Sequence, residues 1–354
     1  MNSASARPTP DAARTGAPIP GFSEVEHSAL TLTLLPLRPL LDDEELTELC
    51  INRPGEAYIE RLTGWERVAL PYASFEWCLR LAKLIANSTR QKIDAQSPLL
   101  SATLPSGERA QIVLPPATTS GTVAITVRRP AYRVWTLEEL RGKRLFARAH
   151  IGTGAAGSPD PREVELGTVL ARQDHIEFLR LAVRARKNIL VSGPTGCGKT
   201  TLAKALILEI PTDERLITIE DSRELVLEHH PNHVRLYYSK DGQGQSQVSP
   251  KQLLQSCLRM RPDRILLAEL RGEEAFDYLR NVNSGHPGSI TSIHASSCEL
   301  AFEQLVLLVK ESNAGRGMDR SDILSLVHQA VDIVIQVGML DHRRCVKEIQ
   351  YCRR

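Results

Sequence analysis

Nine residues of this chain, "GPTGCGKTT" from Gly193 to Thr201, match the pattern G-x-x-x-x-G-K-[ST] at every fixed position. They lie between a strand-like run, "NILVS", and a helix-like run, "TTLAKALILEI", which is the context that the pattern requires. Glycine permits the backbone conformations that let N–H groups surround a phosphate, and the start of a helix adds a favourable dipole. The stretch therefore predicts a nucleotide-binding loop, and both pattern and context disfavour a chance glycine-rich turn. The predicted phosphate-binding residues are Gly193, Pro194, Thr195, Gly196, Cys197, Gly198, Lys199, Thr200 and Thr201.

The end of this loop and one strand end predict contacts to a nucleoside triphosphate and Mg²⁺. Lys199 is expected to reach the β- and γ-phosphates, and the Thr200 hydroxyl is expected to ligate the metal. Glu269 follows the apolar run "ILLA", at the carboxyl end of a strand, where parallel sheets present their ligands. A carboxylate there can hold the magnesium ion or its water. Thr200 and Glu269 are thus the expected metal ligands, and an exposed glutamate at a strand end is the alternative.

A second acidic pair ends the run "LITIED". Hydrolysis needs a group that orients water in line with the γ-phosphate, and Glu220 or Asp221 could provide it, with Glu224 one turn farther along. We favour Glu220, because Asp221 could instead cap the next helix.

Three other residues have weaker signals in their own surroundings. His294 ends the strand-like run "GSITSIH", where a packed structural histidine is the more common outcome. Arg109 in "SGERAQ" and Arg128 in "ITVRRP" are far in sequence from the phosphate loop, and most surface arginines are simply solvated.

Length and composition limit the elements that must position these residues. A chain of 354 residues predicts two domains, and its formal charge of +2 lacks the basic excess of a dedicated nucleic-acid binder. Its seven cysteines form no C-x-x-C pair, which favours reduced thiols in the cytoplasm and no structural zinc. The first 22 residues lack the apolar core of a signal peptide, and no run of about 18 apolar residues suggests a membrane span.

The order of the segments predicts an α/β protein with two domains. Residues 1–24, rich in Ala, Pro, Ser and Thr, are expected to be a mobile tail. Residues 25–130 predict an α+β domain with a mostly antiparallel sheet, and residues 131–167 a linker. In residues 168–354, helical segments alternate with short apolar strands, which predicts a mainly parallel sheet, and the tail predicts a closing hairpin.

Taken in order, "GPTGCGKTT", "RLITIED", "HHPNHVRL", "CLRMRPDRILLAELRGEEAFDYL" and "SGHPGSITSIHA" resemble the ring-forming traffic ATPase of type IV secretion systems, in the secretion and pilus-motor ATPase superfamily. The likeness is strongest over about 185–300. It continues more weakly through "CINRPGEAYIER", "LPSGERAQI" and "ITVRRP". The resemblance implies a homo-hexameric ring, in which each chain has an N-terminal domain and a RecA-like ATPase domain with ATP between them.

The resemblance also implies a role for each site residue. Lys199 and Thr200 correspond to the Walker A contacts, Glu220 to the acidic box, Glu269 to the Walker B carboxylate and His294 to the histidine box, which implies sensing of the γ-phosphate. Arg109 and Arg128 match arginines of the N-terminal domain that approach the terminal phosphates when the domains close. Arg129 is the alternative to Arg128, since neighbours along a strand face opposite sides.

The expected function is an ATP-hydrolysing motor that powers assembly of, or transport through, a type IV secretion system. The expected partners are inner-membrane components of that machine and other secretion ATPases, with no requirement for DNA. The expected location is the cytoplasm, peripherally on the inner membrane. A pilus-retraction or DNA-translocating ATPase and a nucleotide-gated scaffold with little turnover are the alternatives.

Overall fold

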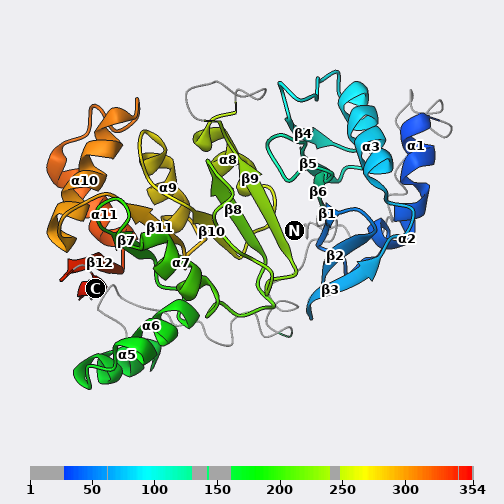
Figure 1. The fold of residues 1–354 in the computed structure, drawn as a ribbon. Coiled ribbons are helices and arrows are strands. Elements are labelled where there is room, and N and C mark those ends of the chain that lie inside the picture. Colours follow the sequence, from blue (N-terminus) through cyan, green and yellow to red (C-terminus); the bar gives the residue numbers. More distant parts are fainter. Residues whose placement is uncertain are drawn as a thin grey trace, which may run out of the picture.

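The structure is a computed structural model that describes residues 28–61, 63–129, 142, 161–239, 248–341 and 343–352 (Figure 1). The predicted tail, residues 1–24, and nearly all of residues 131–160 lie outside the described residues. Residues 161–167, which the sequence assigned to the linker, instead begin helix α5 (Pro161–Ala171).

The N-terminal part has the predicted α+β organisation. Its six strands form one antiparallel sheet in the order β3-β2-β1-β6-β5-β4, which confirms the predicted sheet. Helix α3 (Phe75–Ser88) is capped by the Ser74 hydroxyl and buries its apolar face in the core that also holds strand residues such as Ile51 and Ile112. The other elements are α1 (Ala29–Leu34), η2 (Leu35–Leu37), α2 (Arg38–Leu41), β1 (Glu48–Arg53), β2 (Glu56–Arg61), β3 (Gly64–Ala69), β4 (Leu99–Thr103), β5 (Arg109–Val113) and β6 (Ala124–Arg128).

The C-terminal part contains the predicted parallel strands, divided between a sheet ordered β10-β8-β9 and a sheet ordered β11-β7-β12-β13. Only the last pair, β12 and β13, is antiparallel, and it is the predicted closing hairpin. The strands are β7 (Ile189–Ser192), β8 (Leu216–Glu220), β9 (His233–Tyr237), β10 (Arg264–Leu267), β11 (Ile290–Ile293), β12 (Ile333–Leu340) and β13 (Arg343–Tyr351). The helices are α6 (His175–Arg184), α7 (Lys199–Ile207), α8 (Pro250–Cys257), α9 (Glu274–Asn283), α10 (Cys298–Glu311) and α11 (Arg320–Ala330).

Serine side chains join the two parallel sheets. Ser289 and Ser292 donate their hydroxyls to the carbonyls of Ile265 and Ala268, at 2.7 and 2.9 Å. These bonds satisfy backbone groups where β10 and β11 lack a continuous ladder. The serines of "GSITSIH" therefore hold β11 beside β10 and bring the ends of both strands together.

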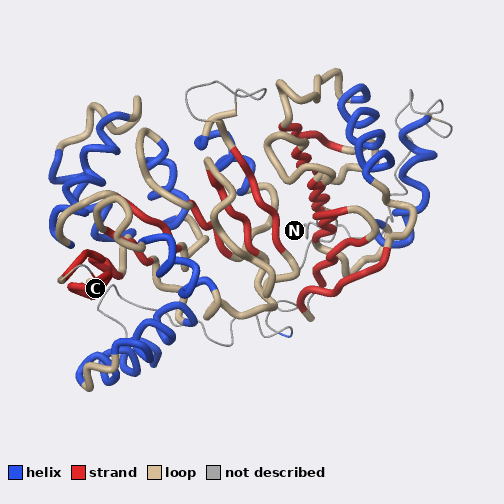
Figure 2. The backbone as a smooth tube through the Cα atoms, viewed as in Figure 1, coloured by secondary structure: helices blue, strands red, loops and turns tan. Residues whose placement is uncertain are grey.

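The two parts share an interface along β9, on the side of the parallel strands away from α7 (Figures 1 and 2). At one end of β9, the Tyr237 N–H donates to the Ala117 carbonyl at 3.0 Å. At the other end, the fully buried Arg215 donates to the side-chain oxygens of Asn52 and Asn232, at 2.8 and 2.6 Å. The N-terminal part is thus bonded to the C-terminal part at both ends of this strand. None of the helices in the described ranges is both long and apolar enough to cross a bilayer.

Candidate functional site

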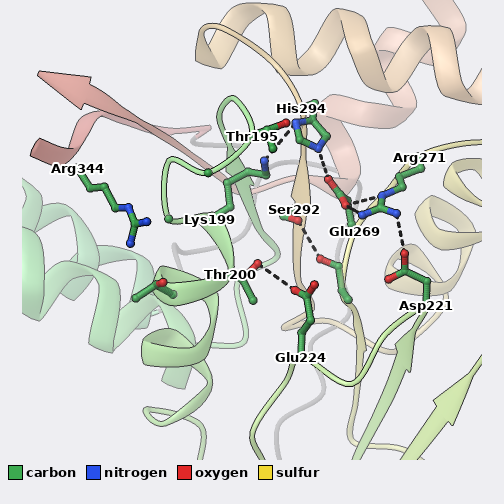
Figure 3. A pocket seen from close by; sticks show the side chains of 14 residues that line it. Thr195, Lys199, Thr200, Asp221, Glu224, Glu269, Arg271, Ser292, His294 and Arg344 are labelled. Carbon is green, nitrogen blue, oxygen red and sulfur yellow. Dashed lines mark hydrogen bonds and ion pairs between the residues drawn. The ribbon is translucent and has the colours of Figure 1, made fainter. Parts of the chain in front are cut away.

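A cavity of about 350 Å³ lies at the carboxyl ends of β7, β10 and β11 (Figure 3). The phosphate loop forms one wall. Side chains that follow β8, β10 and β11 form the others, and Arg344 reaches in from β13. The parallel arrangement explains this convergence, because the carboxyl ends of neighbouring parallel strands meet at one edge.

Two glycines show why the phosphate loop needs its sequence. A Cβ at Gly193 would lie 2.5 Å from the Val337 carbonyl oxygen, so a side chain there would push the loop off β12. Gly198 caps α7 with a left-handed φ of 103°, which side chains rarely adopt. Helix α7 then starts at Lys199 with its free N–H groups at the pocket.

The predicted loop residues fall into two groups, those that line the cavity and those that do not. Gly193, Pro194 and Cys197 are absent from the described residues that line the cavity, and Cys197 is buried under the loop. They shape the loop. Those that do line the cavity are Thr195, Gly196, Gly198, Lys199, Thr200 and Thr201.

Lys199, His294 and Glu269 form a chain of contacts across the cavity (Figure 3). The Lys199 Nζ donates to the Gly193 carbonyl at 2.9 Å and lies 3.2 Å from His294 Nδ1. An ammonium group can only donate, so Nδ1 accepts and the neutral imidazole carries its proton on Nε2. That Nε2 lies 2.6 Å from Glu269 Oε1. His294 thus touches both the predicted phosphate-binding lysine and the predicted metal-binding carboxylate.

Oxygen atoms suited to a hard cation surround the same space. The Thr200 hydroxyl lies 3.2 Å from Glu224 Oε2, and Asp221 and Glu269 are held 2.6 and 2.5 Å from Arg271 nitrogens. Hydroxyl and carboxylate oxygens are the protein ligands that Mg²⁺ prefers, so the set fits the expected metal.

Glu220 lies outside the cavity, unlike its sequence-based assignment. It is fully buried and accepts from Arg235 at 3.0 Å twice, from the Thr218 hydroxyl at 2.7 Å, and from the N–H groups of Glu224 and Leu225. These donors occupy its oxygens, so no water can be oriented there. The carboxylates of this loop that face the cavity are Asp221 and Glu224. Glu220 instead folds the turn that presents them.

The predicted arginines of the N-terminal domain also lie away from the cavity of their own chain. Arg128 pairs in register with Arg109 and Glu48, and its guanidinium lies 3.5 Å from the Glu48 carboxylate. The neighbouring Glu60 bonds Arg261, which precedes β10, at 2.6 Å. This end of the N-terminal sheet therefore faces the amino ends of the parallel strands, whereas the cavity opens at their carboxyl ends.

Arg129 points elsewhere, as the alternation along the strand requires. Its Nη1 donates to the Asp43 carbonyl at 2.5 Å. Arg128 and Arg129 thus have different surroundings.

Sequence reasoning missed Arg271 and Arg344 as cavity residues, and it mentioned Glu224 only as a neighbour. Arg271 could have been found, because it lies two residues after Glu269 and a charge next to a functional strand end is a local signal. Arg344 had no such signal, since its position depends on the pairing of β13 with β12 and of β12 with β7.

Comparison with known proteins gives consistent matches over nearly the whole chain. The profile of the family described as "Type II/IV secretion system protein" matches residues 33–348. The type IV secretion system protein VirB11 of Bartonella quintana is 47% identical over 335 residues, covering 92% of this chain and 94% of the relative. The type IV secretion system protein PtlH of Bordetella pertussis is 43% identical over 312 residues, with coverages of 88% and 91%.

A solved structure matches the fold as well. The crystal structure of the VirB11 ATPase from the Brucella suis type IV secretion system, in complex with sulphate, is 45% identical and superposes with a TM-score of 0.85. The match covers 92% of this chain and 98% of that one, so both parts and the interface between them lie within the region of similarity.

Proposed function

The chain belongs to the type II/IV secretion system protein family, and we propose that it is the ATP-hydrolysing motor of a type IV secretion system. The observation that carries the proposal is the cavity in which the phosphate loop, Glu269 and His294 meet. Relatives that match over nearly the full chain and are named for type IV secretion support the same function.

Bound ATP would supply the phosphoryl group for transfer to water, and Mg²⁺ would supply the Lewis acid that neutralises its charge. In this chain, the amides at the start of α7 hold the phosphates, and Lys199 leaves the Gly193 carbonyl to bind the β- and γ-oxygens. Thr200 and Glu269 would hold the metal. Glu224, whose carboxylate already reaches Thr200, takes the second acidic position that the sequence assigned to Glu220.

His294 is the sensor in this mechanism. When Lys199 turns toward a γ-phosphate, His294 Nδ1 loses the donor that it has here, while Nε2 still faces Glu269. The imidazole is then free to turn its Nε2–H from Glu269 to a phosphate oxygen or to shift with β11. The presence of ATP is thereby transmitted to β11, which pairs with β7 in the sheet.

We further propose that Arg128 and Arg109 act on the nucleotide of a neighbouring chain in a ring of six. Within one chain, Arg128 lies beside Glu48 on a sheet that the β9 interface holds at the amino ends of the parallel strands, so it cannot close onto its own cavity without breaking that interface. A ring supplies a second cavity to the same arginine. The arginines of the N-terminal domain thus keep their predicted role at the terminal phosphates, but they act on the nucleotide of the neighbouring chain.

The proposed setting is the cytoplasmic face of the inner membrane, with inner-membrane components of the secretion machine and other secretion ATPases as partners. DNA is not required for turnover in this proposal.

The test compares ATP hydrolysis and nucleotide binding in three proteins. Lys199→Ala should abolish hydrolysis and greatly weaken ATP binding, because it removes the cation that faces the β- and γ-phosphates. Glu269→Gln should still bind ATP but lose turnover, because it keeps the shape and loses the charge at the metal. A single-turnover assay with excess wild-type protein separates a motor from a scaffold, since a scaffold would bind ATP without releasing phosphate.

A further inference from the structure

Arg344 is fixed over the phosphate loop by the last hairpin of the chain. Strand β12 pairs in parallel with β7, with Gln336 opposite Ser192, and the phosphate loop begins directly after Ser192. Strand β13 folds back along β12 and places Arg344 opposite Met339. The hairpin therefore pairs with the strand that leads into the loop, so Arg344 has a fixed position relative to the loop.

The contact with the loop is close. A Cβ at Gly198 would lie 3.3 Å from Arg344 Cδ, which shows that the arginine stem lies against the residue that caps α7. Figure 3 shows Arg344 on the opposite side of Lys199 from Glu269 and Arg271. The guanidinium thus faces the cavity from the side away from the predicted metal ligand.

The ion pairs and hydrogen bonds in the cavity leave the Arg344 guanidinium available to bind an anion. Among the described residues, three cationic side chains line the cavity, namely Lys199, Arg271 and Arg344. Lys199 donates to loop carbonyls, and Arg271 is ion-paired with Glu269 and Asp221. Arg344 has neither a hydrogen bond nor an ion pair with any described residue, although its guanidinium offers five N–H donors.

We propose that Arg344 binds the phosphates that ATP and ADP share. This inference rests on the proposed function, because it assigns a further contact to the same nucleotide. The amides at Gly198 and the start of α7 hold the α- and β-phosphates, and Arg344 lies against that end of the loop. Lys199, His294 and Glu269 gather on the γ side. Arg344 is therefore a binding residue that does not distinguish the two nucleotides.

An interaction that is equal in the ground and transition states changes affinity and leaves the chemical step unaltered. Arg344→Ala should lower the affinity for ADP by about tenfold or more, the usual effect of losing a charge-assisted hydrogen bond. The KM for ATP should rise by a similar factor while kcat stays within about twofold. Arg344→Lys should recover part of the affinity, because it restores the charge without the planar fork.

Isothermal titration calorimetry of the full chain with ADP and Mg²⁺, together with steady-state hydrolysis, measures both quantities. Arg343→Ala is the matched control. Arg343 is exposed on the same strand, and alternation directs it to the other face, so its affinity should equal that of the wild type. The affinity of Arg344→Ala for GDP, titrated in the same way, should fall by the same factor as its affinity for ADP, since the two nucleotides share the diphosphate.

Unchanged ADP affinity in Arg344→Ala, with wild-type protein binding normally, would overturn the inference. A loss for ATP alone would move the arginine to the γ-phosphate, and unequal factors for ADP and GDP would move it to the base, so either result also overturns it. Failure of the proposed function looks different, because the wild-type protein itself would then bind neither ADP nor ATP.

Discussion

Acidic residues that are close in sequence do different work in this chain. Glu220 ends β8 and Glu224 lies four residues later on the following loop, yet Glu220 is fully buried and Glu224 faces the cavity. Burial of a carboxylate is tolerated only with partners, and Arg235 supplies them through two nitrogens at 3.0 Å. The fold thus uses one glutamate to build the loop and leaves the other facing the cavity.

Glu220→Gln should therefore destabilise the protein, whereas Glu224→Gln should not. Removal of one partner from a buried pair leaves Arg235 without its anion, and such losses cost about 3 kcal/mol or more. Glu224 is exposed, so its replacement should leave stability nearly unchanged and lower turnover. Chemical denaturation and steady-state hydrolysis on the same preparations measure both effects. A Glu220→Gln protein of normal stability that binds ATP but cannot hydrolyse it would return Glu220 to the catalytic position.

The predicted site residues that line the cavity are those with a local signal. The phosphate loop has a fixed pattern, and Glu269 and His294 lie at the ends of apolar strands whose direction follows from the alternation of elements. The burial of Glu220, which was favoured over Asp221, depends on Arg235, and that arginine comes from β9. Arg344 depended on two strand pairings. Such contacts between distant residues leave no mark on the local pattern.

At the scale of the elements, the N-terminal sheet buries charged groups against the ATPase part. Burial raises the pKa of the Glu48 carboxyl to about 7 from an ordinary value of 4.5, and Arg128 opposes this rise only in part. Glu60, Arg261 and Arg215 also act on it. A carboxyl that titrates near neutrality is therefore part of the interface that fixes Arg128.

The pKa of Glu48 gives stability a definite dependence on pH. Its value in the folded state lies above the ordinary one, so between pH 4.5 and 7 the folded state holds a proton that the unfolded state has released. This contribution is complete below pH 4.5 and is lost as the pH rises through 7. Glu48→Gln should remove the dependence, so its gain in stability over the wild type should grow with pH and reach a few kcal/mol by pH 8.

Urea unfolding followed by tryptophan fluorescence measures this gain, and all three tryptophans precede residue 136. The exposed Glu45 provides the control, because Glu45→Gln removes a charge without changing a buried group. Equal unfolding midpoints for Glu48→Gln and wild type at pH 5.5 and pH 8 would contradict the burial argument.

Elements were predicted well where their own residues determine them. The parallel strands of the ATPase part are short apolar runs, and the Ser74 cap that starts α3 acts on a residue three positions away. Two features were not predicted. The start of α5 was assigned to the linker because polar residues surround it, and the break between β10 and β11 depends on serine hydroxyls that replace part of the ladder.

At the scale of the whole molecule, the β9 interface decides which parts can move together. It contains a buried arginine, a backbone bond and an apolar cluster in which Val113 and Ala124 pack with Leu236. Opening it would expose apolar surface and break the buried bond from Arg215 to Asn52, so one chain should move as a unit. Closure on ATP then has to occur between chains, and the protein should assemble into a ring that nucleotide stabilises by mass action. Light scattering with and without ATP measures this assembly, and a monomer at saturating ATP would contradict it.

Mixed rings test whether Arg128 acts between chains. Arg128→Ala keeps its cavity but lacks the arginine, and Lys199→Ala keeps the arginine but lacks a working cavity. Each alone should lose at least about tenfold in turnover, since arginines that stabilise the transferring phosphoryl group are worth roughly 10³ to 10⁵ in rate. When the two proteins are mixed, the intact cavities of the first should receive arginines from the second, and turnover should rise above that of either alone.

Arg129→Ala serves as the control for loss of charge. The Arg129 side chain contacts Asp43 instead, so this variant should hydrolyse ATP normally. If rings shown to be mixed by native mass spectrometry stay inactive, the arginine does not act between chains. If Arg129→Ala rather than Arg128→Ala is impaired, the assignment along the strand is off by one residue.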